Sequence, residues 1–348
     1  MAENVTQLDE ETLHMLQSIS IRVTLPFVYT IVVLFSIPGN SISLYVLFCH
    51  ISPKTPTVIF MINLAITNVA LAVFLPFQIT YHLMGNHWIF GKNLCNILTV
   101  AFYTNMYCSI LTVTCISVER CIGILYPIQS NRWRKKQYAL LACGGTWLGV
   151  LLCLYPLEST DLTYNVHTLN ITTCFDVLKW NMLPNTAAWA AFLFTLFILF
   201  FLIPFIITVI CYTVIIWKLF KAAKRHENLQ KKRRSVCLAI IVLLVFITCF
   251  SPNNFSMLAH MIKRLFYKVG IYPVYKLTLT LSCFSTCLDP FIYYYASKEF
   301  RCKLRSLFRM SRESVSSIDR GAFSSSQQGE LLEINQRLYS DGNIRRLY

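Results

Sequence analysis

An acid and a base stand side by side at the end of a long apolar stretch. Glu119 and Arg120 follow a run without a charged residue from Leu94 to Val118. A charged group inside a membrane costs about 3 kcal/mol or more, so such residues are functional candidates. The only acid deep within an apolar stretch is Asp289, and these deep parts hold no Lys or Arg. A single deep acid suits a switching or structural role better than an ion pathway, which needs several ionisable groups.

Polar residues in other apolar stretches are expected to surround this acid. Amides and hydroxyls hydrogen-bond between membrane helices at modest cost, and we expect Asp289 to lie among Asn40, Asn68 and Ser109. Zinc-ligand spacings, nucleophile–base pairs and phosphate-binding loops are absent from the sequence,. We therefore predict neither an enzyme nor a site for a cofactor or metal.

The elements that carry these residues are predicted to be membrane helices. The chain has 348 residues, of which 55% are hydrophobic and 14% charged; soluble domains carry about 25% charged residues. Stretches long enough to cross the hydrocarbon as helices are Leu25–Cys49, Pro56–Leu83, Lys92–Leu125, Gln137–Pro156, Ala188–Phe220, Arg234–Met261 and Tyr272–Ala296. The expected fold is an all-α membrane protein, a seven-transmembrane helix bundle with a short amphipathic eighth helix. The domains are an extracellular N-terminus (1–24), the bundle (25–297), a membrane-surface helix (298–310) and a disordered cytoplasmic tail (311–348).

Basic residues predict the orientation. They gather in the loops after the third and fifth stretches and after the seventh, which the positive-inside rule places in the cytoplasm,. The net charge of +15 thus reflects topology and contact with lipid headgroups, not nucleic-acid binding. The glycosylation sequons at Asn4 and Asn170 fall on the side predicted to be extracellular,. Of the cysteines, only Cys95 and Cys174 map to that side, and we expect them to form a disulfide.

Motifs in nearly every helix then resemble the rhodopsin-like (class A) G-protein-coupled receptors over about Leu25 to Met310. The matching motifs, in chain order, are Gly39-Asn40, "NLAITN" at Asn63–Asn68, "WIFG" at Trp88–Gly91, Glu119-Arg120, Trp147, Pro204 with Tyr212, "FITCFSP" at Phe246–Pro252 and "DPFIY" at Asp289–Tyr293.

The resemblance implies a G-protein switch at Glu119 and Arg120. At rest Glu119 would hold the Arg120 guanidinium, which on activation would turn toward Tyr212 and the G protein, with Tyr293 joining Tyr212. A guanidinium suits this because its permanent charge exchanges partners without deprotonation. The residues implied to transmit the signal are Ile110, Pro204, Phe246 and Phe250. A heterotrimeric G protein, arrestin and receptor kinases are the implied partners, beside membrane lipids.

Two departures from the family pattern carry consequences. The sixth helix starts with Lys232, Arg233 and Arg234, so no acid there clamps Arg120, and we expect basal activity. Asn68 stands where the family has an Asp, so we expect weak inhibition by sodium.

The ligand is predicted to be anionic. Phe102 stands where amine receptors carry an Asp, whereas basic residues gather at the extracellular ends of the helices. We expect Lys276, Lys179 and Arg264 to hold an anionic head. An apolar body would lie against Tyr81, Phe102, Tyr103, Met106, Asn254 and Met257,.

More narrowly, the chain resembles the purinoceptor branch, through segments such as "TCFDVLKW", "SPNNF" and "CLDPFIYYYASKEF". That resemblance implies a lipid-like or prenyl-glutathione-type ligand and coupling through the Gα12/13 class to Rho and restraint of cell migration. One alternative is a purine or pyrimidine nucleotide receptor, although Asn254 and Met257 replace the His and the basic residue typical of such members. Another is a transporter or a scavenger that binds its ligand without signalling.

Overall fold

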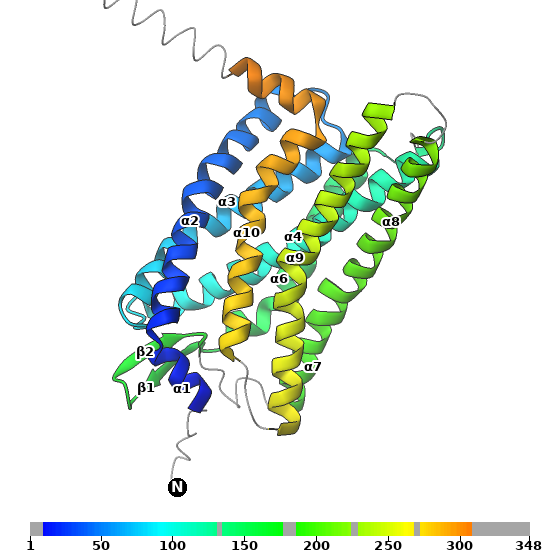
Figure 1. Cartoon of the computed structure of the whole chain (residues 1–348). Helices are drawn as coiled ribbons and strands as arrows, with labels where there is room; N and C mark the ends of the chain where they lie inside the picture. The colour runs from blue at the N-terminus through cyan, green and yellow to red at the C-terminus, as the bar shows by residue number, and fades with distance from the viewer. Residues whose placement is uncertain (1–9, 131–133, 177–185, 224–228, 268–271, 308–348) are drawn as a thin grey trace, which may run out of the picture. The chain divides into compact units, whose positions relative to one another are not determined.

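The computed structural model describes residues 10–130, 134–176, 186–223, 229–267 and 272–307. The described residues are almost entirely helical. Long helices lie alongside one another in a bundle, and a two-stranded hairpin and a short helix lie at one end (Figure 1). The bundle is formed by α2 (Ile19–Tyr45) continued by η1 (Val46–His50), α3 (Pro56–Leu83), α4 (Gly91–Leu125), α6 (Lys136–Ser159), α7 (Thr186–Phe197) continued by η2 (Ile198–Leu202) and α8 (Ile203–Ala223), α9 (Leu229–Tyr267) and α10 (Tyr272–Ala296).

Each predicted membrane span corresponds to a helix of this bundle. Within the described residues, six helices are long and apolar enough to cross a membrane. The remaining one, α10, has 25 residues, which suffices by length,, but it carries Lys276, Asp289 and many hydroxyl-bearing residues. Boundaries shift at the ends: the first span begins at Ile19 rather than Leu25, and the Arg22 backbone N–H closes its first turn by donating to the Ser18 carbonyl at 3.2 Å.

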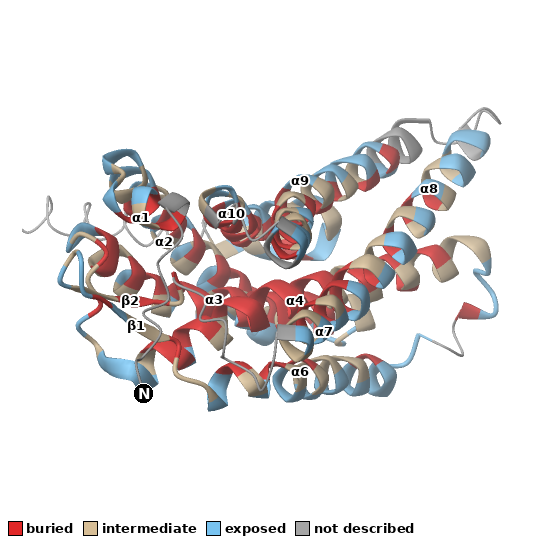
Figure 2. Cartoon of the chain, turned by 90° about the horizontal axis from the view of Figure 1, so that it is seen from below, coloured by how far each residue is buried: buried red, intermediate tan, exposed pale blue. Residues whose placement is uncertain are grey.

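The core lies around α3 and α4. Figure 2 shows α4 coloured as buried along most of its length, whereas α6 is mostly intermediate or exposed. In the most apolar window of α3, 72% of residues are buried, against 17% in α6. A helix that is apolar throughout yet buried on a narrow stripe presents the rest of its surface to lipid, so α6 lies at the membrane-facing surface.

One end of the bundle, here called the hairpin end, carries α1 (Glu10–Gln17) and the strands β1 (Thr163–Val166) and β2 (Ile171–Cys174). The strands pair antiparallel, with Thr163 opposite Cys174 and Val166 opposite Ile171. The other end, here called the Arg134 end, carries the segment between α4 and α6.

Residues 298–307 form a further helix within a separate compact unit, Lys298–Tyr348. This is the amphipathic eighth helix that the sequence predicts. Its predicted last residues, 308–310, and the predicted tail lie outside the described residues.

Candidate functional site

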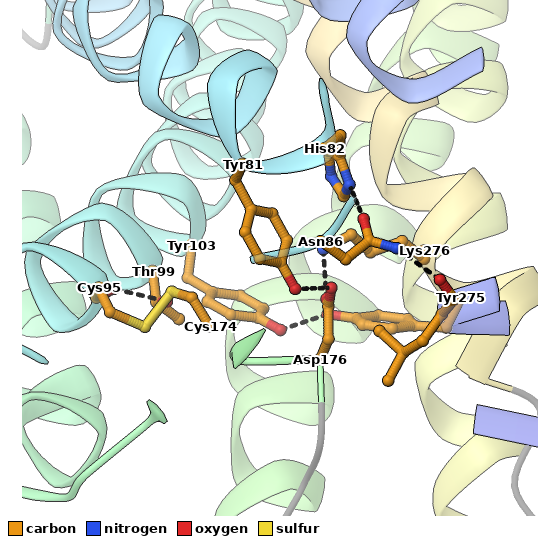
Figure 3. A network of polar contacts seen from close by, with 11 residues as sticks. Tyr81, His82, Asn86, Cys95, Thr99, Tyr103, Cys174, Asp176, Tyr275 and Lys276 are labelled. Carbon is orange, nitrogen blue, oxygen red and sulfur yellow. Dashed lines mark hydrogen bonds and ion pairs between the residues drawn. A yellow bond between two sulfur atoms is a disulfide. The ribbon is translucent and has the colours of Figure 1, made fainter. Parts of the chain in front are cut away.

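A buried ion pair lies at the hairpin end. The Lys276 ammonium on α10 contacts the Asp176 carboxylate, two residues past β2, with 2.5 Å between Nζ and Oδ1. Tyr81 on α3 donates its hydroxyl to the other carboxylate oxygen at 2.7 Å. Lys276 is 5% exposed and Asp176 is 1% exposed. Figure 3 shows the three side chains converging from two helices and the loop.

The disulfide between Cys95 and Cys174 positions this acid. It joins the start of α4 to the end of β2, as the sequence predicts, with the two Cα atoms 5.7 Å apart. After Cys174 the backbone turns at Phe175, which has a φ of 60° and donates its N–H to the Leu162 carbonyl at 2.9 Å. Because the chain is held at both residues that precede Asp176, this side chain is directed into the bundle.

The environment of Asp176 keeps its carboxylate charged. Burial raises the pKa of Asp176. The positive charge of Lys276, an electrostatic contribution from His82 and hydrogen bonds from Lys276 and Tyr81 all lower it. These contributions outweigh burial, so the pKa lies below its ordinary value of 3.8,. The Asp176 carboxylate is therefore charged at neutral pH.

The polar contacts extend from the ion pair toward the N-terminal helix. A ring nitrogen of His82 lies 2.7 Å from the Asn86 amide oxygen, and the Asn86 amide donates to the Leu16 carbonyl of α1 at 3.0 Å. The hydroxyls of Tyr103 and Tyr275 form a hydrogen bond between α4 and α10 (Figure 3). Hydrogen bonds thus connect α1 with α3, and α4 with α10, around the pair.

The structure gathers the predicted lining of the ligand site. Five of its residues are buried in one core cluster, namely Tyr81, Phe102, Tyr103, Met106 and Met257. Asn254 is fully buried and donates to the Phe250 carbonyl at 2.9 Å. Lys179 and the Arg264 side chain lie outside the described residues. The role of Lys276 as a cation for an anionic head stays a prediction. A buried ammonium requires a counter-charge, and in this structure Asp176 supplies it.

Midway along the bundle, amides join four helices around Asp289. The Asn68 amide donates to the Asp289 carboxylate at 2.7 Å and to the Asn40 amide oxygen at 3.1 Å. Asn105 of α4, which the sequence reasoning did not single out, donates to Asn68 at 3.2 Å. Ser109 is buried, but its hydroxyl has no hydrogen-bond partner among the described residues. The structure therefore shows no hydrogen bond between Ser109 and Asp289, and the expected grouping of Ser109 with this acid stays a prediction.

At the Arg134 end, Glu119 holds a different base from the expected one. The Arg134 Nε–H donates to the Glu119 carboxylate at 2.6 Å, and a second guanidinium nitrogen contacts the same oxygen. Thr57 donates its hydroxyl to the other oxygen at 2.8 Å. The expected pair between Glu119 and Arg120 is corrected accordingly. Neighbouring residues on a helix point about 100° apart, so Arg134, which approaches from the connecting segment, reaches the Glu119 carboxylate more directly than Arg120 does.

Arg120 lies within electrostatic range of the Tyr212 hydroxyl, which has no hydrogen-bond partner among the described residues. Tyr212 is fully buried on α8, as is Tyr293 on α10. Of the predicted transmission residues, Ile110, Phe246 and Phe250 are buried, and the rings of the two Phe lie 5.6 Å apart between centroids. Pro204 is buried, and its carbonyl lies 3.4 Å from the Thr114 hydroxyl.

The two predicted glycosylation sites differ in what the structure describes. Asn170 is exposed in the turn between β1 and β2, where its φ is 51°. Asn4 lies outside the described residues. The accessible turn suits a glycan at Asn170, which stays a prediction.

Sequence reasoning missed Arg134 as the partner of Glu119, and it named Asp176 only as one of three acids, with Glu158 and Asp161, that could balance the extracellular cations. Asp176 had a usable signal, since it stands two residues after a cysteine predicted to be tied to α4. Arg134 is one of four basic residues close together in one segment, with Arg132, Lys135 and Lys136, so its spacing alone did not distinguish it.

Comparison with known proteins identifies the family of this chain. The family model described as "7 transmembrane receptor (rhodopsin family)" matches residues 39–293. The chain is 62% identical to the P-two-Y purinoceptor 8 of Gallus gallus over 89% of its own length and 86% of the relative's. It is 57% identical to the S-geranylgeranyl-glutathione receptor of Homo sapiens, covering 91% and 88%. Similarity extends to "Proteinase-activated receptor 1" of Xenopus laevis, at 41% identity covering 81% and 66%.

These matches confirm the resemblance to rhodopsin-like receptors and to the purinoceptor branch. The relatives are receptors and not enzymes, and the apolar helices indicate a multi-pass protein of the plasma membrane. A heterotrimeric G protein and a small-molecule ligand are the partners that this family implies. The chain belongs to the rhodopsin family of seven-transmembrane receptors.

Proposed function

We propose that this receptor recognises an extracellular anionic amphiphile at its hairpin end and signals through a G protein at its Arg134 end. The observation that carries the proposal is the Lys276 ammonium, buried on α10 and balanced by an acid from a loop. A lysine at this depth is costly unless an anion accompanies it. The site is therefore built around one negative charge.

Asp176 supplies that charge in this structure and gives way to the ligand on binding. It belongs to a segment between helices, so it can move more readily than the helix that carries Lys276. An anionic head that takes its place keeps the ammonium paired, so Lys276 is not left unpaired by the exchange. The Tyr81 hydroxyl, which donates to Asp176 at 2.7 Å, offers the incoming anion a second hydrogen bond.

The apolar part of the ligand follows from the residues below the pair. The cluster that contains Phe102, Met106 and Met257 is aromatic and flexible, which suits an apolar chain,. The human relative is named a receptor for S-geranylgeranyl-glutathione, a molecule that joins a peptide bearing carboxylates to an apolar prenyl chain. We propose a ligand of the same class for this chain.

On the opposite side of the membrane, Arg120 and Tyr212 serve the G protein. The proposed transducer is the Gα12/13 class, leading to Rho and restraint of cell migration, with arrestin and receptor kinases acting on the cytoplasmic side. In this arrangement the N-terminus is extracellular and the C-terminus cytoplasmic. The electrostatic influence of Arg120 on Tyr212 supports the switch.

A nucleotide ligand is the alternative. Against it, the described part of α9 presents buried Asn254 and Met257 rather than a cation beside the cluster. Within the described residues, Lys276 is the one cation of the predicted head-group site, and phosphate groups need more positive charge than it provides. A non-signalling scavenger or transporter has no use for Arg120 beside Tyr212.

The test is nucleotide exchange on separate Gα classes in membranes that carry the receptor. Each sample is challenged with S-geranylgeranyl-glutathione, a lysophospholipid, ADP and UTP. The variant Arg120→Ala tests the switch. The double variant Asp176→Asn with Lys276→Met tests the head-group site, since it removes both charges together and leaves neither one buried alone. Surface expression of every variant is measured in parallel.

We expect an anionic amphiphile to drive exchange on Gα12/13, and both variants to lose the response while they still reach the surface. An unchanged dose curve in the double variant would remove Lys276 from the ligand site. A response to ADP or UTP, but to neither amphiphile, would replace our ligand with a nucleotide.

A further inference from the structure

Two free thiols lie between neighbouring helices near the Arg134 end of the bundle. Cys121 on α4 is 8% exposed, and Cys211 on α8 is half-buried. Cys211 packs against the core cluster that contains Cys121 and Tyr212. Within this packing the two thiol groups share a side-chain hydrogen bond. We call these two residues the α4–α8 dithiol.

The hydrogen bond holds the two sulfur atoms next to each other across the interface between the helices. A disulfide requires that they approach further, to a covalent S–S distance of about 2.05 Å. Side-chain rotation can supply a change of this kind without unfolding either helix, because each thiol is carried on a single Cβ. A thiol that stands beside a second thiol is also the arrangement typical of redox-sensing cysteines. The α4–α8 dithiol is thus a candidate for reversible oxidation.

The dithiol stands directly beside the residues assigned to the switch. Cys121 follows Arg120 on α4, and Cys211 precedes Tyr212 on α8. Arg120 acts electrostatically on Tyr212, whose buried hydroxyl has no hydrogen-bond partner among the described residues. A covalent bond one residue away on each helix would therefore fix the separation across which Arg120 and Tyr212 act on each other.

We propose that hydrogen peroxide oxidises the α4–α8 dithiol to a disulfide, which ties α4 to α8 beside the switch. The Cys211 thiolate, on the more accessible of the two residues, attacks one peroxide oxygen. The O–O bond breaks, hydroxide leaves and becomes water with the proton of the thiol, and Cys211 becomes a sulfenic acid. The Cys121 sulfur, as its proton departs, then attacks the Cys211 sulfur and expels hydroxide, which this proton converts to water. The two sulfurs are oxidised, and the peroxide is reduced to water.

The side of the membrane fits a reversible bond. The Arg134 end faces the cytoplasm in the proposed orientation, and cytoplasmic disulfides are transient and redox-sensing rather than structural. We expect the disulfide to raise basal exchange, because it keeps Tyr212 beside Arg120, the arrangement assigned above to activation. This consequence rests on the proposed coupling to a G protein, whereas formation of the disulfide does not.

The experiment treats the full receptor in nanodiscs with hydrogen peroxide, which catalase removes before a G protein is added. Free thiols are alkylated, and mass spectrometry searches the digest for peptides joined through Cys121 and Cys211. Cys211→Ser removes the half-buried partner, and Cys121→Ala removes the buried one without introducing a polar group. Cys237→Ser is the matched control, because Cys237 is an exposed free thiol on the neighbouring helix α9. Basal exchange on Gα12/13 is measured before peroxide, after it and after reduction with dithiothreitol.

We expect the joined peptides in the unmodified receptor and in Cys237→Ser, and their loss in Cys211→Ser and in Cys121→Ala. Peroxide should raise basal exchange about two- to tenfold in the first two proteins alone, and dithiothreitol should reverse the rise.

The peptide and exchange measurements separate this inference from the proposed coupling. Thiols that stay unjoined, or that oxidise separately, would overturn the disulfide whatever the receptor couples to. Joined peptides with unchanged or lowered basal exchange, in a receptor that its ligand still activates, would overturn the activating role. Joined peptides in a receptor that drives no exchange under any condition would support the disulfide and contradict the proposed coupling.

Discussion

Each end of the bundle carries an ion pair between a helix and a connecting segment, but the two pairs differ in their enclosure. At the hairpin end, Lys276 and Asp176 are almost fully buried. At the Arg134 end, the Glu119 side chain is 8% exposed, whereas that of Arg134 is 38% exposed. Both carboxylates accept a further hydroxyl hydrogen bond, from Tyr81 and Thr57 respectively.

The difference teaches what each pair can do. Two enclosed charges depend on each other, because removal of one leaves the other without a counter-charge or water. Such a pair changes partners only when another anion arrives, which is a property of a ligand site. A half-exposed pair is supported by solvent and contributes little net energy, so it exchanges partners easily, as a switch requires.

The largest expected effect on stability comes from removing only one of the two charges of the enclosed pair. Lys276→Met leaves the Asp176 carboxylate buried and unpaired, which should destabilise the receptor by about 3–5 kcal/mol. The measurement is thermal unfolding of the purified receptor in nanodiscs, together with its half-life at fixed temperature.

The double variant Asp176→Asn with Lys276→Met is the control for this change. It removes both charges and should recover most of the lost stability, since an amide at residue 176 still accepts from Tyr81. If the double variant is as unstable as Lys276→Met alone, packing of the lysine stem, rather than an unpaired charge, is responsible.

At the Arg134 end we expect a smaller effect, which changes basal activity rather than stability. Arg134→Gln releases Glu119, which then becomes available to Arg120 and holds it in the resting position. Basal exchange should therefore fall about two- to fivefold, because a partly exposed pair contributes up to about 1 kcal/mol. Stability should change little. The measurement is basal nucleotide exchange, normalised to surface expression, against mock-transfected membranes.

Lys135→Gln is the matched control, since it removes the same charge from the exposed neighbouring residue. It should leave basal exchange unchanged. A rise in basal exchange with Arg134→Gln would mean that the Glu119–Arg134 pair itself restrains the receptor, rather than keeping Glu119 away from Arg120.

The sequence was most informative where hydrophobicity alone decides the structure. The α3 boundaries, Pro56 and Leu83, agree with the prediction because Pro favours the first turn and Thr55 caps it, its hydroxyl accepting from the Val58 N–H,. The pairing of Cys95 with Cys174 also followed from membrane sidedness. The first is a property of one segment, whereas the second follows from the order of the membrane spans along the chain.

The sequence was less informative where several polar residues compete for one partner. Asp289 has Asn40, Asn68, Asn105 and Ser109 on neighbouring helices, and helix rotation decides which of them reach it. Glu119 likewise had several bases within range along the chain. These choices depend on distances between side chains of different helices, which no local pattern encodes.

The smallest expected effect is that of acid on the enclosed pair. The pKa of Asp176 is lowered below 3.8. A group with a depressed pKa contributes stability above its unfolded pKa, and this contribution is lost only as pH falls through the lower, folded value. Acidification from about pH 7.4 to about pH 5 stays above both values, so the pair should remain intact. The difference in thermal stability between the receptor and the double variant should therefore be the same at both pH values when both proteins also carry His82→Asn, because His82 interacts with both charges of the pair and its titration would not cancel in the subtraction. A difference that shrinks at the lower pH would show that Asp176 takes up a proton there. The ion pair at the hairpin end would then exchange partners as readily as the pair at the Arg134 end.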